Sequence, residues 1–278
     1  MPGEIRRMSL PYLIYKRVRA GFGITFGFIL MYGVLTSSIG IPLLAIAAGF
    51  LFIHLFGDLY NDSCDYEEDR KNMRKDKLTL NGNVDVSGMR KISFIAVAAG
   101  SIILFSVDIL LFLVGLYYAV MLFAYSNPRI RLKNYHYWCY LLAAGTVWPP
   151  IVFGMNLLFS QAFSLSTIMP MAFFSSQFFY ILCQKDSTDK KDIKNIFISN
   201  SWNTAWSICV FSAVFAITAF SGLIYSAAML IPLFINIAAK FFNLSKIRDR
   251  TITRQTRGRL MLVEFLTPYM YIVSSMVA

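Results

Sequence analysis

The feature that most constrains this chain is how its positive charges alternate between long apolar segments. All 26 Lys and Arg residues lie before or at the beginning of the first apolar segment, or within or at the edge of every second gap after it, and the gaps between hold none. Because Lys and Arg accumulate in the cytoplasmic loops of membrane proteins, this pattern sets an orientation. It predicts that the N-terminus and the cation-bearing loops are cytoplasmic and that the C-terminus lies outside.

The apolar segments predict an all-α integral membrane protein. Each is close to the ~20 residues that a helix needs to cross ~30 Å of hydrocarbon. The expected spans are 18–37, 39–60, 92–107, 109–126, 137–158, 164–183, 203–221, 223–240 and 259–276. They indicate a bundle of about nine transmembrane helices in a single membrane domain over residues 1–278.

Charge and cysteine usage narrow the function classes. The net charge of +11 is explained by membrane orientation and by attraction to anionic headgroups, so we expect no nucleic-acid partner. The four cysteines form no CxxC pair, which argues against a zinc site.

An acidic cluster follows the second span. Asp58, Asp62, Asp65 and Asp69 are spaced i, i+4, i+7 and i+11, so on a helix they share one face. Like charges on successive turns repel each other, and a divalent cation turns that repulsion into a binding site. Mg²⁺ takes carboxylate oxygens together with water and phosphate oxygens. The alternative is a solvated acidic helix end, which is an ordinary feature of proteins.

The loop after this cluster is rich in cations. Segment 61–91 holds seven acidic and seven basic residues. Cations beside a carboxylate–metal site suit a phosphate substrate, because they neutralise a departing pyrophosphate. The alternative is that the Lys and Arg side chains only balance the acids.

A second acidic cluster is predicted on the same side of the membrane. Asp186, Asp189 and Asp192 lie at i, i+3 and i+6, so the first two share a helical face, and Lys185 precedes them. By itself this composition is also typical of a solvated loop. Because both clusters face one membrane surface, together they predict two metal sites that hold one diphosphate as it departs.

Three segments resemble motifs of the UbiA-type intramembrane prenyltransferases. The segment Asn61-Asp62-x-x-Asp65-x-x-x-Asp69 resembles the NDxxDxxxD motif of that family. The segment from Tyr125-Ser126 to Lys133 is similar to its YSxPxxxxK segment, and Asp186-x-x-Asp189 resembles the start of its second Asp-rich motif. The order of the motifs and the predicted topology are similar to those of this family along the whole chain.

The resemblance implies a helical bundle around a central chamber that opens sideways into the lipid, with cytoplasmic cap loops that carry the Asp motifs. It implies transfer of a prenyl group from a prenyl diphosphate, bridged by Mg²⁺ to the motifs, onto a lipophilic or amphipathic acceptor. The lipid bilayer is then a partner, and no obligatory protein partner is expected.

Roles for single residues follow by matching the motifs. The implied metal ligands are Asp62, Asp65, Asp69, Asp186 and Asp189, of which Asp62, Asp65, Asp186 and Asp189 are the catalytic set. The implied substrate-binding residues are Asn61, Lys77, Tyr125, Ser126, Lys133 and Lys185. The chain departs from the family pattern at Asp192, which comes one residue early, and at Lys77, which stands where an Arg is common.

Two other functions remain open at this stage. The same clusters suit a terpene cyclase that uses a prenyl diphosphate without an acceptor, and carboxylates also suit a cation transporter. Transport favours ionisable groups near the middle of the bilayer, whereas most acids here lie at one face. Asp58 lies deeper, where an acid is functional by default, and we expect it to tune the metal site or to accept a proton. We expect His54 to be a packed, hydrogen-bonded side chain rather than a base.

Overall fold

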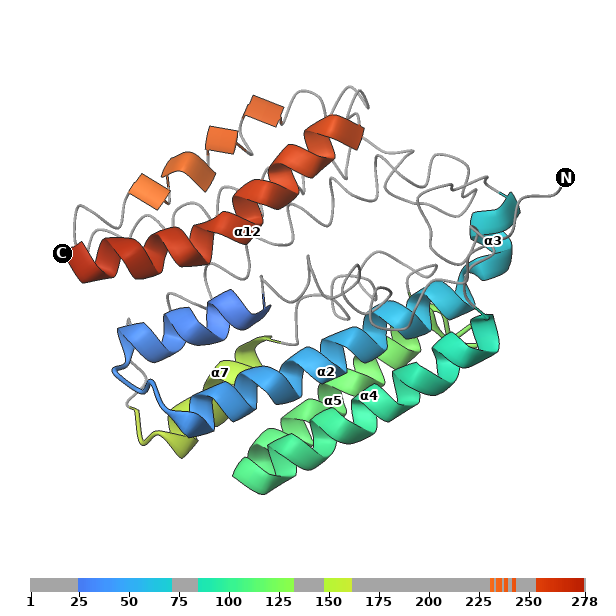
Figure 1. Ribbon diagram of the computed structural model, residues 1–278, viewed down its shortest axis with the longest axis horizontal. Coiled ribbons are helices and arrows are strands. Elements are labelled where there is room, and N and C mark those ends of the chain that lie inside the picture. Colours follow the sequence, from blue (N-terminus) through green and yellow to red (C-terminus); the bar gives the residue numbers. More distant parts are fainter. Residues whose placement is uncertain are drawn as a thin grey trace, which may run out of the picture. The chain divides into compact units, whose positions relative to one another are not determined.

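The computed structural model describes residues 25–71, 85–132, 148–161 and 254–277, together with scattered positions between 231 and 243. Within these ranges the chain is helical and contains no strand (Figure 1). It divides into two compact units. Unit 1 comprises Met1–Phe26 and Leu44–Lys133, and unit 2 comprises Gly27–Leu43 and Asn134–Ala278.

Unit 1 contains the three described helices that are long and apolar enough to cross a membrane. These are α2 (Ile41–Cys64), α4 (Val86–Val107) and α5 (Ile109–Ser126), and the first three residues of α2 belong to unit 2. A short helix, α3 (Tyr66–Lys71), follows α2. The predicted span 109–126 is confirmed to the residue, whereas α4 begins before the predicted 92 and α2 continues beyond the predicted 60.

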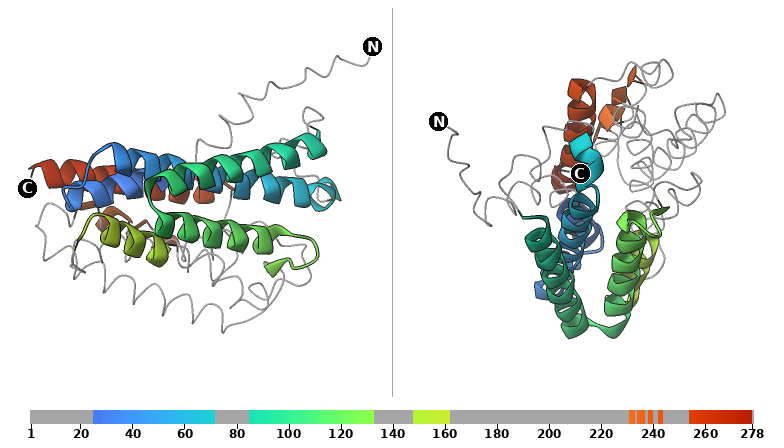
Figure 2. Two further views of the ribbon diagram at one scale, coloured as in Figure 1. Left: turned by 90° about the horizontal axis from the view of Figure 1, so that it is seen from below. Right: turned by 90° about the vertical axis from the view of Figure 1, so that its right-hand side faces the viewer.

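A single residue, Asp108, separates α4 from α5. It has an extended conformation (φ −165°, ψ 140°), and its side chain accepts hydrogen bonds from the N–H groups of Leu110 at 2.8 Å and Leu111 at 3.1 Å. Such a cap satisfies N–H groups that have no partner within the helix. Asp108 therefore ends one helix and begins the next, and the second view of Figure 2 shows the resulting hairpin.

Glycines bring the three helices of unit 1 close together. A Cβ atom added to Gly100 of α4 would lie 2.6 Å from the carbonyl oxygen of Gly49 on α2, which is closer than atoms pack. A Cβ atom added to Gly57 of α2 would lie 2.7 Å from the side chain of Leu122 on α5. Small residues at helix contacts are typical of bundles in lipid, because association there depends on close packing.

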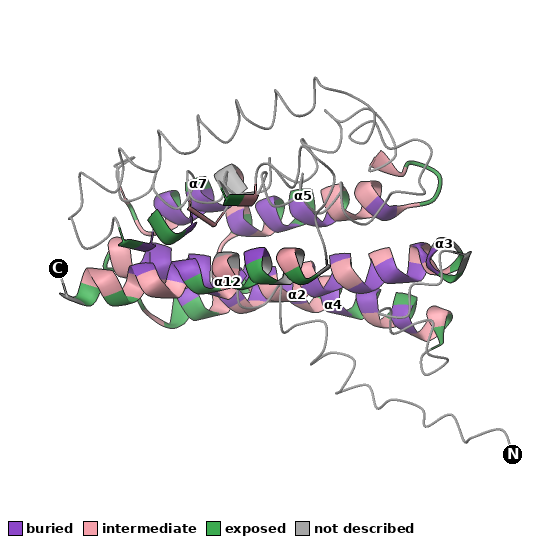
Figure 3. Cartoon of the chain, turned by 90° about the horizontal axis from the view of Figure 1, so that it is seen from above, coloured by how far each residue is buried: buried purple, intermediate pink, exposed green. Residues whose placement is uncertain are grey.

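The other faces of α4 and α5 expose large apolar side chains (Figure 3). These side chains are Ile95, Ile102, Phe105, Ile109, Leu113 and Val120, each more than half exposed. An aqueous surface does not carry so many large apolar groups on one helix pair, whereas a lipid-facing surface does.

Unit 2 includes most of the helix Thr25–Leu35 and two further helices, α7 (Trp148–Leu158) and α12 (Arg254–Val277). The Tyr32 hydroxyl donates a hydrogen bond to Asn156 Oδ1 at 2.7 Å, which joins the first helix to α7. Gly27 contacts Pro268 of α12, where a Cβ atom would lie 2.9 Å from the proline ring. The predicted spans 164–183 and 203–221, and most of 223–240, lie outside the described residues.

Candidate active site

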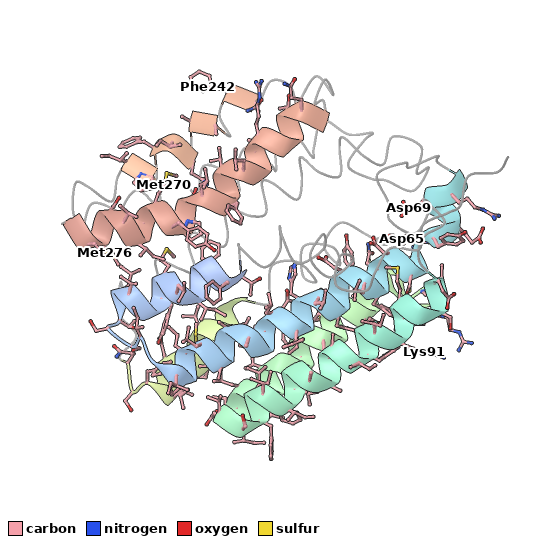
Figure 4. The ribbon with its side chains drawn as sticks, viewed as in Figure 1. Asp65, Asp69, Lys91, Phe242, Met270 and Met276 are labelled. Atoms are coloured by element: carbon pink, nitrogen blue, oxygen red, sulfur yellow. The ribbon has the colours of Figure 1, made fainter. Side chains whose placement is uncertain are left out.

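The first acidic motif lies where α2 ends and α3 begins (Figure 4). Asp62 is on α2, Asp65 is at the bend between the helices, and Asp69 is on α3. The Asp65 N–H donates to the Asn61 carbonyl at 2.9 Å, and the Asp69 N–H donates to the Asp65 carbonyl at 2.8 Å. Helical hydrogen bonds thus continue through the bend, and the shared face of the motif carboxylates stays a prediction from their spacing.

The motif carboxylates are buried. Asp62 is 1% exposed, Asp65 is 8% exposed and Asp69 is 4% exposed. Glu67, one turn away, is exposed and pairs with Arg70 across 3.2 Å at the surface. Buried carboxylates are rare unless they are paired or bind cations. The three motif acids therefore differ from the solvated acidic helix end that the sequence left open.

Arg131 forms an ion pair with the motif. Its Nη2 atom lies 3.1 Å from Asp65 Oδ1, and both side chains are largely buried. Arg131 comes from the turn after α5 and has a positive φ of 42°, which is uncommon for a residue with a side chain. The turn therefore holds a strained residue at the position from which its guanidinium contacts the motif.

Asn127 organises that turn. Its carbonyl accepts hydrogen bonds from the N–H groups of Ile130 at 3.1 Å and Arg131 at 2.7 Å, and its Oδ1 accepts from the N–H of Arg129 at 2.9 Å. Its Nδ2 donates to the Tyr60 hydroxyl at 2.9 Å. One residue, through its carbonyl and its side chain, therefore shapes the turn and fixes it to α2.

A neighbouring bond joins the end of α5 to the motif itself. Ser126 is buried, and its hydroxyl donates to Asn61 Oδ1 at 3.0 Å. Asn61 and Ser126 were both predicted as substrate-binding residues, and the structure brings the two together. Tyr125, predicted with them, is half-buried in the last turn of α5.

Tyr60 is also the centre of an aromatic cluster. Its ring stacks on Phe56 at 5.5 Å and on Phe123 at 5.1 Å, and it meets the edge of Phe94 at 5.8 Å. These rings come from α2, α4 and α5 and pack the helices together directly below the motif. Phe56 and Tyr60 therefore serve as packing between the helices.

Deeper along α2, His54 lies between two polar side chains. Its Nδ1 is 2.9 Å from the hydroxyl of Tyr118 on α5, and its Nε2 is 3.8 Å from Asp58 Oδ2. His54 is thus packed and hydrogen-bonded, as predicted.

The donor atoms of the motif suit magnesium. In the described part of the chain, no group of three His, Cys, Asp or Glu side chains is arranged to hold a metal. The available ligands are carboxylate and amide oxygens, and Mg²⁺ typically uses one or two carboxylates and completes its shell with water and substrate phosphates. The oxygen donors of the motif therefore fit a Mg²⁺ ion whose coordination shell the protein supplies only in part.

Several predicted site residues lie outside the described residues: Lys77, Lys133, Lys185, Asp186 and Asp189. Sequence reasoning missed Arg131, Asn127 and Tyr118. The first two lie inside the segment that resembles a family motif, so their position carried a signal. Tyr118 is one aromatic among many, and nothing in the sequence marked it.

A model of the UbiA prenyltransferase family matches residues 20–265. The chain belongs to this family. It is therefore an intramembrane prenyltransferase, and its membership agrees with the apolar helices α2, α4 and α5. No curated protein sequence matches the chain.

A solved structure of similar fold comes from a study of digeranylgeranylglyceryl phosphate synthase in membranes. Its TM-score to this chain is 0.67 at 14% sequence identity, and the match covers 97% of this chain and 98% of the other. At this identity the likeness shows a shared fold.

Proposed function

We propose that this protein transfers a prenyl group from a prenyl diphosphate to a lipophilic or amphipathic acceptor with Mg²⁺-assisted release of pyrophosphate. The observation that carries the proposal is the burial of Asp62, Asp65 and Asp69, with Arg131 paired to Asp65. Membership of a prenyltransferase family supports it. The proposed architecture is one domain of about nine helices around a chamber, with cytoplasmic cap loops that carry the Asp motifs.

In this mechanism Asp62, Asp65 and Asp69 hold the metal, and Arg131 contacts the diphosphate. Bound Mg²⁺ supplies positive charge that stabilises the departing pyrophosphate. A guanidinium binds phosphate through two parallel hydrogen bonds, so Arg131 is suited to move from Asp65 to a phosphate oxygen. Ser126 orients Asn61 through the bond described above, and Asn127 keeps the turn in place.

The remaining predicted residues complete the proposal. Asp186 and Asp189 would hold a second metal, while Lys185, Lys77 and Lys133 would neutralise phosphate charge. Tyr125 would face the diphosphate or the acceptor.

The acceptor class is addressed by direct assay. Purified protein in lipid nanodiscs is given radiolabelled geranylgeranyl diphosphate and Mg²⁺, with geranylgeranylglyceryl phosphate or 4-hydroxybenzoate as acceptor. We expect pyrophosphate release that depends on one acceptor and that stops with EDTA. Release without acceptor, with a hydrocarbon product, would instead identify a cyclase. Absence of release with every acceptor and chain length of donor would contradict prenyl transfer.

A further inference from the structure

A polar chain of three residues lies beneath the acidic motif within unit 1. It runs from Tyr118 on α5 through His54 to Asp58 on α2, with the distances of 2.9 Å and 3.8 Å given above. The helical rise of about 1.5 Å per residue places Asp58 ~6 Å from Asp62 along the axis, and His54 twice as far. The chain therefore begins one turn below the residues that are proposed to hold the diphosphate.

The exposed fraction of the three side chains increases from Tyr118 through His54 to Asp58. Tyr118 is only 5% exposed, the His54 side chain is 28% exposed and the Asp58 side chain is 39% exposed. Ionisable side chains at this depth of a span face a protein cavity or water rather than lipid, because exposure to hydrocarbon is costly. Tyr118 is thus the buried end of the chain, and the Asp58 carboxylate is the accessible end.

The two nitrogens of the His54 ring face the two other members of this polar group. Nδ1 is bonded to the Tyr118 hydroxyl, and Nε2 faces Asp58. The 3.8 Å separation is longer than a hydrogen bond, and such contacts commonly tighten when substrate binds. An acid oriented by a histidine that a third group fixes is a common arrangement for proton transfer.

We propose that Asp58 is the general base for the acceptor, and that His54 and Tyr118 position it. This inference rests on the prenyl transfer proposed above, and it names the substrate class as an acceptor with a reactive hydroxyl. The bond between C1 of the prenyl chain and the diphosphate oxygen breaks, and the pyrophosphate leaves with both electrons. A lone pair of the acceptor oxygen forms the new C–O bond, and the hydroxyl proton goes to the Asp58 carboxylate.

The position of Asp58 suits this step. From a diphosphate held at Asp62 and Asp65, an apolar prenyl chain would extend toward the apolar part of the helices, where Asp58 lies. A second anion directly beside the diphosphate would be repelled, whereas one helical turn of separation reduces that repulsion. His54 Nε2 can then take the proton from Asp58 in the tautomer whose hydrogen is on Nδ1.

The test compares variants in nanodiscs with radiolabelled geranylgeranyl diphosphate, Mg²⁺ and geranylgeranylglyceryl phosphate or 4-hydroxybenzoate. General bases typically contribute 10²–10⁴-fold, so Asp58→Ala should lower kcat at least about 100-fold with an unchanged KM for the donor. Added formate should raise the kcat of Asp58→Ala at least about tenfold, because it replaces the lost carboxylate. Wild-type kcat in Asp58→Ala, or a loss that formate does not relieve, would overturn the assignment.

Separate measurements test the positioning roles of His54 and Tyr118. Tyr118→Phe and His54→Ala should each lower kcat about tenfold without changing the donor KM, and imidazole should restore His54→Ala. A loss in His54→Ala that imidazole leaves unchanged would contradict the positioning role. Asp85→Ala, which removes a carboxylate at the N-cap of α4 just as Asp58→Ala removes one beneath the motif, should keep wild-type kcat.

Donor binding separates the two proposals. Mg²⁺-dependent binding of geranylgeranyl diphosphate should be lost in Asp65→Ala and kept in Asp58→Ala. If the wild-type protein shows no such binding, both proposals fail. If the wild type transfers the prenyl group and Asp58→Ala matches it, only the base assignment fails.

Discussion

The three spans of unit 1 are held together differently at their two ends. Toward Asp108, Gly49 and Gly100 bring the backbones of α2 and α4 together, and nearer the motif Gly57 lets α2 approach Leu122 of α5 in the same way. At the other end, three polar bonds join α2 to the end of α5 and the turn after it. They link Asn61 to Ser126, Tyr60 to Asn127, and Asp65 to Arg131.

Because of this difference, we expect stability and activity to depend on different parts of the same helices. Close packing of glycines stabilises helix association without any polar group. Buried polar networks are costly when incomplete, so a network is expected where chemistry requires its groups. We therefore expect substitutions near Asp108 to change the free energy of unfolding, and substitutions at the motif end to change turnover.

The largest expected effect is at the motif. Asp65→Ala removes a proposed metal ligand and the partner of Arg131, and should lower kcat by about 10³-fold. Because it leaves the largely buried Arg131 without that partner, it should also lower the melting temperature in detergent. Glu67→Gln is the matched control, because Glu67 is an exposed acid two residues away. Near-normal turnover in Asp65→Ala would contradict the proposed role of Asp65 as a metal ligand. It would also contradict the expectation that substitutions at the motif end change turnover.

The next effect is at the packed end. Gly100→Val adds a Cβ atom and two methyl groups at a position where the Cβ atom alone would lie 2.6 Å from the Gly49 carbonyl oxygen. Overpacking of this kind typically costs about 1–3 kcal/mol of unfolding free energy, measurable by denaturation in mixed micelles. Ala98→Val on the exposed face of α4 controls for helix propensity. Equal stability of the two variants would show that the glycine contact does not hold the helices.

A smaller effect is expected at the ion pair. Arg131→Lys keeps the charge but loses the planar guanidinium, and should raise the KM for the prenyl diphosphate about tenfold. Arg129→Lys, an exposed residue of the same turn, should behave as wild type. If both variants raise KM alike, the turn contributes general charge rather than a specific contact.

The smallest effect is at the cap between α4 and α5. Asp108→Ala removes two hydrogen bonds to the first turn of α5 and should cost about 1 kcal/mol in unfolding free energy, with kcat unchanged. Asp108→Asn preserves an acceptor and should restore most of that stability. A change in kcat with Asp108→Ala would mean that the two ends of the hairpin are coupled.

Sequence patterns located the spans better than they located the helix ends. The predicted 39–60 stopped where the polar run Asn61-Asp62-Ser63 begins, whereas α2 continues through that run to Cys64. Likewise α4 begins at Val86, where the side chain of Asp85 caps it, before the apolar run starts. Hydropathy reports where lipid contacts the chain, whereas caps and backbone bonds decide where the helix ends.

The candidate site was predicted in part. The spacing of Asp62, Asp65 and Asp69 placed their carboxylates on one face, since helical periodicity is a local property. The pairing of Arg131 with Asp65 depends on a positive φ and on the bonds of Asn127, and no spacing in the sequence reveals it.

The sequence alone determined that the chain is helical and membrane-embedded, that its first Asp motif lies on one helical face, and that its motifs resemble one family. Apolar length, charge distribution and helical period are properties of neighbouring residues, so they are readable without a fold. Only the tertiary structure decided that the motif acids are buried, that Arg131 reaches Asp65, and that Tyr118 meets His54 from 64 positions along the chain. Those contacts depend on how α5 packs against α2, because residues so distant in sequence meet only when two helices are brought side by side.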